Sequence, residues 1–463
     1  MAAQQSLRTE RVSAASHGIH NFYFETGARR RPCIIRGEGI FMWDRDGRRY
    51  IDVSSGPVVN NLGHGNRRVL AAMQAQAEKI VFVAPSQFDS EPSLRLSELT
   101  AELAGSGLER AFFTSGGSEA VESAMKLARQ YAVALGEDER WKVIGREPGY
   151  HGATLGAVAV GGDLNAEAMF APLARMMPKV PAPLSYRVPD NHTPESYAQA
   201  CAAALERTIR EEGPETVLAF IMEPVGGLAT GALVAPDAYY KAVREICTSY
   251  GVLLIFDEVM SGAGRTGRFL AAEHWGVRPD LAVLAKGLAA GYTPFGAVLA
   301  SAELVSTVAE AGGFLNGFTY FANPLSCAVA EAVMRETLER GLFGQAEFMG
   351  ERLEARLRGL AETSAIIGDV RGKGLLLALE LVADKASKRM IPIELMAPNR
   401  FQELALDHGL AVYCRRTNRG RYGDWMMISP PLIIIEAELD ELVGRLGEAL
   451  AQYERELRAK GVL

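Results

Sequence analysis

Two short apolar runs, each followed at once by an ionisable residue, constrain the fold of this chain more than any other feature. Residues 252–256 and 281–285 are entirely apolar and lack the period of an amphipathic helix, which is typical of strands buried on both faces of a parallel sheet. The first run is followed by Asp257 and the second by Lys286. Because open α/β sheets bind ligands at the carboxyl ends of their strands, we expect this carboxylate and this amine at one rim.

The chemistry of Lys286 at such a rim differs from that of a lysine in water. Burial favours the neutral amine, which is the nucleophilic form that condenses with carbonyl compounds. A carboxylate held nearby, here Asp257, can keep a pyridinium nitrogen protonated, as a pyridoxal cofactor requires of its protein. Taken singly, each residue has a simpler explanation, because acids cap helices and lysines extend from strand ends to solvent.

A glycine- and serine-rich turn follows a third predicted strand. Residues 111–113 form a short apolar run, and Gly117 and Ser118 come directly before the helical pattern of residues 121–133. Backbone N–H groups at the start of a helix favour an anion, most often a phosphate. An ordinary capping box is the alternative explanation.

Two more predicted strands end in the same way. Residues 142–145 lead to Tyr150, which stands between glycines, and residues 217–222 are followed by Glu223. An aromatic ring at such a place can lie flat against a planar ligand. The repetition of polar and aromatic strand ends predicts one shared ligand site at the edge of one sheet.

Two other patterns do not indicate a site. Residues 262–267 match the glycine spacing of a dinucleotide-binding turn, but five residues separate them from the strand, and Asp280 precedes the next strand instead of following it. His17 and His20 have the spacing of half a metal site without an identifiable second pair. We therefore expect neither a nicotinamide nucleotide nor a metal.

The composition limits the partners and the compartment. The chain has 463 residues and a formal net charge of -7, which argues against a nucleic acid as the main partner. Its five cysteines are scattered without a CxxC pair, as expected for reduced thiols in the cytoplasm. The first residues lack the apolar region of a secretory signal, and no apolar run is long enough to span a membrane. These features predict a cytoplasmic protein without a membrane partner.

The order of patterns predicts an α/β fold with two domains. Short β-rich runs occupy residues 33–53, helix and strand alternate from about residue 67, and helices and strands alternate again after residue 350. We assign residues 61–335 to a large domain with a mostly parallel sheet. Residues 1–60, beginning with a polar arm, and residues 336–463 are expected to form a smaller α+β domain.

Six segments occur in an order that resembles the class III aminotransferases. They are Ser-Gly-Gly-Ser-Glu-Ala from residue 115, Tyr-His-Gly from 150, Met-Glu-Pro-Val from 222, Ile-Phe-Asp-Glu-Val from 255, Ala-Lys-Gly-Leu from 285 and Gly-Phe-Thr-Tyr from 317. These enzymes use pyridoxal 5′-phosphate and have the fold of aspartate aminotransferase, fold type I. The resemblance extends from about residue 34 to residue 431, and its most specific element is Asp257 with Lys286 placed 29 residues later.

The resemblance implies a role for each residue around the cofactor. Lys286 would be the Schiff-base lysine and Asp257 the partner of the pyridine nitrogen. Val259 would contact one face of the ring and Tyr150 the other. Glu223 corresponds to the glutamate that the family has near cofactor and substrate.

The resemblance also implies how the cofactor phosphate is held. Backbone N–H groups at Gly117 and Ser118 would bind it, together with Thr319 from the second subunit. The protein would then be a homodimer or a dimer of dimers.

The implied reaction moves an amino group from an amine or ω-amino acid donor to a keto acid acceptor such as pyruvate. An aminomutase or a decarboxylase on the same fold would keep the cofactor without exchanging keto acids. A binding protein that has lost the chemistry is a third possibility, against which the intact Lys286 and Asp257 argue.

The substrate side departs from the family pattern at two places. Many amine-type members have an aromatic residue where this chain has Ser-Gly-Pro-Val at 55–58. Several arginines precede Gly423 in a longer segment, where the family places the arginine that binds substrate carboxylates. We select Arg421, with Arg416 in reserve, against the alternative of a surface charge cluster.

Overall fold

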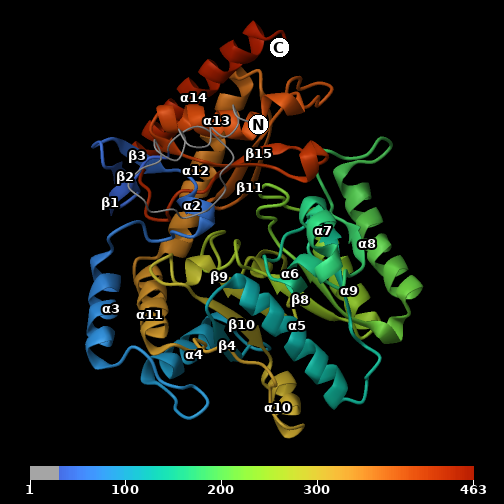
Figure 1. Ribbon diagram of the computed structural model, residues 1–463. Coiled ribbons are helices and arrows are strands. Elements are labelled where there is room, and N and C mark those ends of the chain that lie inside the picture. Colours follow the sequence, from blue (N-terminus) through green and yellow to red (C-terminus); the bar gives the residue numbers. More distant parts are fainter. Residues whose placement is uncertain (1–30) are drawn as a thin grey trace, which may run out of the picture.

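The computed structural model describes residues 31–463. The polar arm before Gly27, with His17 and His20, lies outside the described residues. Figure 1 shows two parts, a large sheet-containing part that is lowest in this view and a smaller part above it, formed by the two ends of the described chain.

A seven-stranded sheet forms the centre of the large part. Its strands, in spatial order, are β4 (Arg110–Thr114), β10 (Gly296–Ala300), β9 (Leu281–Ala285), β8 (Leu253–Asp257), β7 (Val217–Met222), β5 (Lys142–Glu147) and β6 (Lys179–Pro181). Only β10 runs antiparallel to its neighbours. The prediction that the two apolar runs form adjacent parallel strands is confirmed, since they are β8 and β9, with Ile255 opposite Leu281.

Helices cover both faces of this sheet because the strand residues alternate between two apolar cores. Ile255 and Val283 belong to a core with α5, whereas Phe256 and Leu284 belong to a core on the opposite face. The helices of this part are α3 (Arg67–Lys79), α4 (Glu91–Ala104), α5 (Gly117–Ala134), α6 (Leu155–Val160), α7 (Leu164–Phe170), α8 (Pro194–Glu212), α9 (Asp237–Ser249), α10 (Ala302–Glu310) and α11 (Pro324–Glu339). Short 3₁₀ helices are η1 (Ala171–Leu173), η2 (Pro214–Thr216), η3 (Ala271–Trp275) and η4 (Lys286–Leu288).

The smaller part contains two four-stranded sheets. The first is β1 (Ile34–Glu38), β2 (Phe41–Asp44), β3 (Arg49–Asp52) and β13 (Leu410–Ala411); the second is β11 (Ile367–Lys373), β12 (Leu376–Leu381), β15 (Asp424–Ile428) and β14 (Tyr413–Arg416). Its other elements are α2 (Ser55–Val58), α12 (Leu342–Thr363), α13 (Ala397–Asp407), α14 (Glu436–Ala459), η5 (Ile393–Leu395) and η6 (Asn418–Gly420). One apolar core joins Ile51 of β3 to Leu442 of α14, so residues far apart in sequence fold together. The domain boundaries at residues 60 and 335 stay a prediction.

Three local structures differ from the sequence prediction. The expected strand at 410–414 is divided at Val412, because β13 pairs with β3 whereas β14 pairs with β15. The segment from 163 to 194, expected to be irregular, contains α7 and β6. The expected loop after Val53 contains the four-residue α2, whose backbone is distorted by positive φ angles at Gly56 and Val58.

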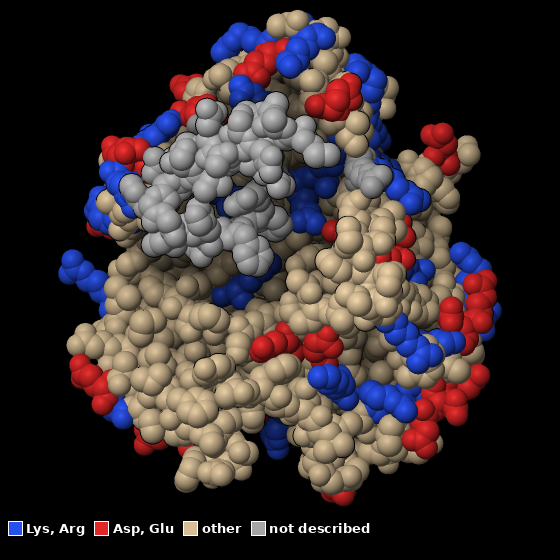
Figure 2. Space-filling model, viewed as in Figure 1, with Lys and Arg blue, Asp and Glu red and all other residues tan. Residues whose placement is uncertain are grey.

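The surface of the large part has an area with few charged side chains, at the lower left of Figure 2, where α3, α4 and their connection lie. Exposed apolar side chains in this connection and in the segment before α11 are Ile80, Val81, Phe82, Phe88, Leu315 and Tyr320. The rings of Phe82 and Tyr320 meet edge to face with centroids 6.0 Å apart, which places the two segments side by side. In the part of the chain that is described, no helix has the length and apolar character needed to cross a membrane.

Candidate active site

A cavity of about 440 Å³ opens at the carboxyl edge of the seven-stranded sheet. Five strands reach it, because β4, β5, β7, β8 and β9 each lead directly into a segment that lines its wall. Seven of the residues selected from the sequence line the cavity: Gly117, Ser118, Tyr150, Glu223, Asp257, Val259 and Lys286. The other three, Thr319, Arg416 and Arg421, are not among its lining residues.

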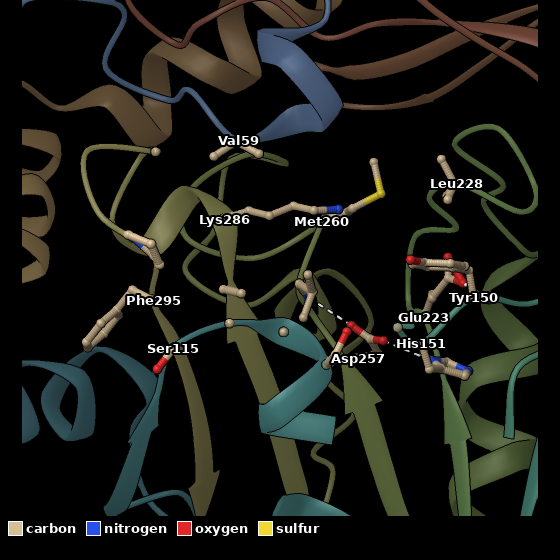
Figure 3. A pocket seen from close by; sticks show the side chains of 18 of the residues that line it. Val59, Ser115, Tyr150, His151, Glu223, Leu228, Asp257, Met260, Lys286 and Phe295 are labelled. Carbon is tan, nitrogen blue, oxygen red and sulfur yellow. Dashed lines mark hydrogen bonds and ion pairs between the residues drawn. The ribbon is translucent and has the colours of Figure 1, made fainter. Parts of the chain in front are cut away.

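Lys286 is placed by the abrupt end of β9. Its backbone adopts a left-handed conformation with φ of 43°, which an L-residue rarely adopts, and begins the short helix η4. Figure 3 shows the side chain extending into the cavity toward Met260. Burial lowers the pKa of the amine to about 8, although the negative charges of Asp257 and Glu223 act in the opposite direction. The neutral amine is therefore accessible near physiological pH.

Asp257 is held rigidly at the end of β8. Its Oδ2 lies 2.8 Å from Nδ1 of His151, and its Oδ1 accepts a hydrogen bond of 3.0 Å from the Val259 N–H (Figure 3). The carboxylate is buried, with 5% of its surface exposed. A carboxylate fixed in this way keeps its orientation toward the cavity.

His151 was not selected from the sequence as a site residue, although it follows Tyr150 directly. Its Nε2 is buried and has no hydrogen-bond partner in the part of the chain that is described. A doubly protonated ring would leave a buried N–H without an acceptor, so the geometry favours a neutral ring whose Nδ1–H donates to Asp257. The signal that could have found it is its position after β5, on the same sheet edge as Asp257.

Glu223 organises the backbone on the other side of Asp257. Its carboxylate accepts hydrogen bonds from the N–H groups of Tyr150 and Gly227, at 2.9 Å for Tyr150. Burial raises the pKa of the Tyr150 hydroxyl, so this side chain stays neutral at the cavity wall. Glu258, the next acid after Asp257, points elsewhere: it accepts from Ala272 N–H at 2.9 Å, and burial raises its pKa to about 7.

The opposite end of the cavity is the start of α5. The helix begins at Gly117 after the N-cap Gly116, and no side chain caps its first turn. A Cβ atom at Gly117 would lie 3.2 Å from both methyl groups of Val259, so a glycine allows the turn to pack tightly against this wall. The uncapped N–H groups and the positive end of the helix dipole suit an anion.

These features fit pyridoxal 5′-phosphate. The uncapped start of α5 can bind a phosphate, the buried Asp257 can hold a proton on a ring nitrogen, and the Lys286 amine can react with an aldehyde. The observation that decides the fit is the His151 ring, whose one paired nitrogen is committed to the carboxylate. No group of three or more potential metal-ligating side chains is gathered within residues 31–463.

The remaining wall of the cavity comes from separate segments of the chain. Val59 follows α2 of the smaller part, Leu228 lies in the turn after β7, and Met260 lies in the turn after β8. Figure 3 shows Val59, Leu228 and Met260 at the upper side of the cavity, above the strand ends. None of the three was selected from the sequence, because nothing in their local pattern distinguishes them from core residues.

A buried arginine holds the Val59 segment in place. Arg265 Nη2 donates to Asn61 Oδ1 at 2.6 Å and to Ser55 Oγ at 3.4 Å, on the two sides of Val59. Its Nη1 donates to the carbonyls of Ser429 and Pro430 at 3.3 and 2.5 Å, and burial lowers the pKa of the guanidinium to about 9. The clamp fixes a segment in which Val58 has a φ of 62°.

The arginines predicted to bind a substrate carboxylate are not at the cavity. Arg421 is exposed over 63% of its side chain and pairs with Glu147 at 3.3 Å. Arg416 contacts both oxygens of Asp424 and is only 11% exposed. Because residues alternate along a strand, the neighbour of Arg416 on β14 points the other way.

That neighbour is Arg415. Its Nη2 donates to Asp163 Oδ2 at 2.9 Å, and its positive charge acts on the Tyr150 hydroxyl, which lines the cavity. Among the three arginines compared, Arg415 is therefore the one beside the site. The selection of Arg421 failed because nearness in sequence to Gly423 does not show which way a side chain points from β14.

Comparison with known proteins gives one consistent result. The family model described as Aminotransferase class-III matches residues 24–450. An uncharacterised aminotransferase, YodT, from Bacillus subtilis is 38% identical over 92% of this chain and 96% of its own. The putrescine–pyruvate aminotransferase of Pseudomonas aeruginosa is 34% identical over 92% of this chain and 91% of its own.

Solved structures agree over almost the whole length. An (S)-enantioselective omega-transaminase from Thermomicrobium roseum matches with a TM-score of 0.88 and 36% identity, over 96% of this chain and 98% of that one. The omega-transaminase of Pseudomonas jessenii, solved in complex with PMP, matches with a TM-score of 0.88 and 31% identity, over 96% and 97% of the two chains. The prediction of fold type I is confirmed by these matches.

Proposed function

The chain belongs to the class III aminotransferases, and from that premise we propose that it moves an amino group from an amine or ω-amino acid to a keto acid such as pyruvate. The family depends on pyridoxal 5′-phosphate. The observation that carries the proposal is the buried Lys286 amine, with its pKa of about 8, beside the fixed carboxylate of Asp257. The putrescine–pyruvate relative supports a small amine as donor and pyruvate as acceptor.

Each residue around the cavity has a task in this proposal. The N–H groups of Gly117 and Ser118 would bind the phosphate, Val259 and Tyr150 would enclose the ring, and Lys286 would hold the cofactor covalently. When bound, pyridoxal 5′-phosphate supplies an electron sink for the electron pair left when the Cα–H bond of the donor breaks.

Two side chains control protons. Asp257 keeps the ring nitrogen protonated, and the His151 hydrogen bond holds that carboxylate in place. Lys286, once released from the cofactor as a free amine, takes the proton from the donor and returns it at the neighbouring carbon. Its lowered pKa suits this work, because a base is most effective when its pKa is close to the working pH.

We assign the substrate carboxylate to Arg415 in place of Arg421 and Arg416. Arg415 has its charge beside Tyr150, and a guanidinium can hold a carboxylate through two parallel hydrogen bonds. The support is geometric: Arg416 is occupied by Asp424, and Arg421 lies in solvent at Glu147.

We also propose that the protein acts in the cytoplasm as a homodimer or a dimer of dimers. Thr319 is exposed and does not line the cavity of its own chain, which supports a role in the phosphate site of a second subunit. Exposed Phe82 and Tyr320 lie close to it in an area with few charges (Figure 2), as expected for a surface that becomes buried.

A donor panel with pyruvate tests the reaction. Purified protein loaded with pyridoxal 5′-phosphate should be yellow and should form alanine from pyruvate when putrescine, a monoamine or an ω-amino acid is present. Donor consumption that does not depend on pyruvate would indicate an aminomutase or a decarboxylase instead. Loaded protein that neither forms alanine nor consumes any donor would contradict the proposal.

Subunit mixing tests the assembly. Lys286→Ala and Thr319→Ala proteins should each be inactive or weak, and mixing them should form heterodimers in which one site carries both defects and the other neither. Recovered activity is therefore expected after subunit exchange, which labelled subunits can verify. Exchange without recovery would mean that Thr319 acts within its own chain.

A further inference from the structure

The ion pair between Arg415 and Asp163 has no part in the cofactor chemistry, although it lies beside the cavity. It joins β14 of the smaller part to the turn before α7 of the large part, with 2.9 Å between Nη2 and Oδ2. The side chains of Arg415 and Asp163 are 31% and 16% exposed. The pair is thus neither a surface contact nor fully enclosed.

Asp163 is fixed independently of Arg415. Its Oδ1 caps α7, accepting from the N–H groups of Asn165 and Ala166 at 3.0 and 3.3 Å. The next N–H, of Leu164, donates to the buried Asn418 side chain at 2.9 Å. Because these bonds do not involve the guanidinium, the carboxylate keeps its place when Arg415 moves.

Arg415 is held much less firmly than its neighbour. A single nitrogen of its guanidinium contacts Asp163, and its other donors have no partner in the described range 31–463. Arg416 by contrast uses two nitrogens on Asp424 and donates to the carbonyls of Ile391 and Ile393 as well. A pair made through one nitrogen can exchange its partner, whereas a bidentate and largely buried pair cannot do so without a large cost.

We propose that Asp163 is the resident partner of Arg415, holding the guanidinium when a donor without a carboxylate is bound and releasing it to the carboxylate of the keto acid. This inference rests on the proposed function and on Arg415 as the carboxylate-binding residue. It adds a specificity-determining residue that contacts neither substrate nor cofactor. Asp163 is accordingly a positioning residue that acts through Arg415.

The physical reason is the cost of an unpaired charge. With a neutral amine in the cavity, a guanidinium without a partner would lie against an apolar molecule in a partly dry site, which is unfavourable. Asp163 removes that cost. With a keto acid present, two carboxylates compete for one guanidinium, so Asp163 weakens acceptor binding while it protects donor binding. The two half-reactions must therefore respond to its loss in opposite directions.

The variant Asp163→Asn tests this, because asparagine can still cap α7 but no longer carries the charge. Single-turnover absorbance of the loaded enzyme measures each half-reaction separately. For a monoamine donor we expect the apparent dissociation constant to rise, and for pyruvate to fall, each by about fivefold, as for a partly exposed ion pair. Propionate, which can bind but not react, should inhibit the variant at lower concentration than the original protein.

Two controls make the result specific. Glu167→Gln removes a negative charge from the same helix without touching Arg415 and should change neither half-reaction. In the Arg415→Ala background, adding Asp163→Asn should have no further effect, because a residue that acts through another cannot act after its removal. An equal change in both half-reactions, or an effect that persists without Arg415, would overturn the inference.

The outcome is distinguishable from a failure of the proposed function. If the original protein does not transaminate pyruvate, the proposed function fails before any variant is compared. If it does, and Asp163→Asn keeps its cofactor spectrum and melting temperature but leaves the affinities for amine, pyruvate and propionate unchanged, only the role of Asp163 is overturned.

Discussion

The two ends of the cavity are built in different ways. At the sheet edge, Asp257, Lys286 and Glu223 each stand directly after a strand of one seven-stranded sheet, so a single framework fixes them. At the other end, Val59 and Arg415 come from the smaller part of the molecule and are positioned by side chains such as Asn61 and Asp163. The reaction chemistry therefore depends on strand ends, whereas substrate choice depends on contacts between segments far apart in sequence.

Removal of the amine at the sheet edge should have the largest effect. Lys286→Ala should abolish transamination, because both the covalent attachment and the proton transfer are lost. Borohydride should then no longer fix the cofactor to the protein. Lys179 provides the matched control, since burial lowers its pKa to about 8 as well, but its amine donates to the carbonyls of Ala159 and Met177 outside the cavity. Lys179→Met should keep its activity per folded molecule, and retained activity in Lys286→Ala would contradict the assignment.

Asp257→Asn should lower kcat by about 10²–10⁴-fold, as for other lost electrostatic partners. The amide cannot keep the ring nitrogen protonated, so the electron sink is weakened. Glu258→Gln is the control, because that acid is adjacent and buried but bonded outside the cavity; it should retain most of the activity. If the two variants lose similar amounts, Asp257 has only a structural role and the sheet edge loses its distinction.

At the substrate end, two arginines should differ sharply. Arg415→Ala should raise KM for pyruvate by roughly thirtyfold, equivalent to about 2 kcal/mol, the lower part of the range for truncating a charged pair. The half-reaction with a neutral amine should change much less. Arg421→Ala, at an exposed side chain, should leave both half-reactions unchanged. Steady-state kinetics with pyruvate decide between them, and the opposite pattern would restore the choice made from the sequence.

The smallest expected effect is the pH dependence of cofactor capture by apoprotein. Because the amine reacts when neutral, the rate should rise about tenfold per pH unit below the Lys286 pKa of about 8 and level off above it. Asp257 raises that pKa, so Asp257→Asn should shift the midpoint to lower pH. Stopped-flow absorbance measures this rate. A midpoint near the ordinary lysine value would mean that Lys286 is solvated.

The sequence predicted the sheet edge because the physical signal there is local. An apolar run that ends on an ionisable residue is read within six positions, as for residues 252–257 and 281–286. His151 was visible in the same pattern but could not be recognised, since only the folded chain brings its Nδ1 to Asp257. The strand at 410–414 was located correctly as β structure, but its division between two sheets depends on pairing with β3 and β15.

The substrate end carries no comparable local signal. Val59, Leu228 and Met260 are ordinary apolar residues in the sequence, and the cavity collects them from three different turns. Four arginines between residues 415 and 421 are equivalent in composition. What separates Arg415 from Arg416 is the alternation of side chains along β14 and the acids opposite each, Asp163 and Asp424.

The Arg265 clamp has a consequence for protein engineering. It fixes the backbone on both sides of Val59 through Ser55 and Asn61, while the Val59 side chain itself faces the cavity. A combinatorial library aimed at new donors can therefore randomise position 59 without disturbing the scaffold. Positions 55, 61 and 265 should be kept constant, because variants there would be lost to misplacement of the loop before any difference in donor preference could be selected.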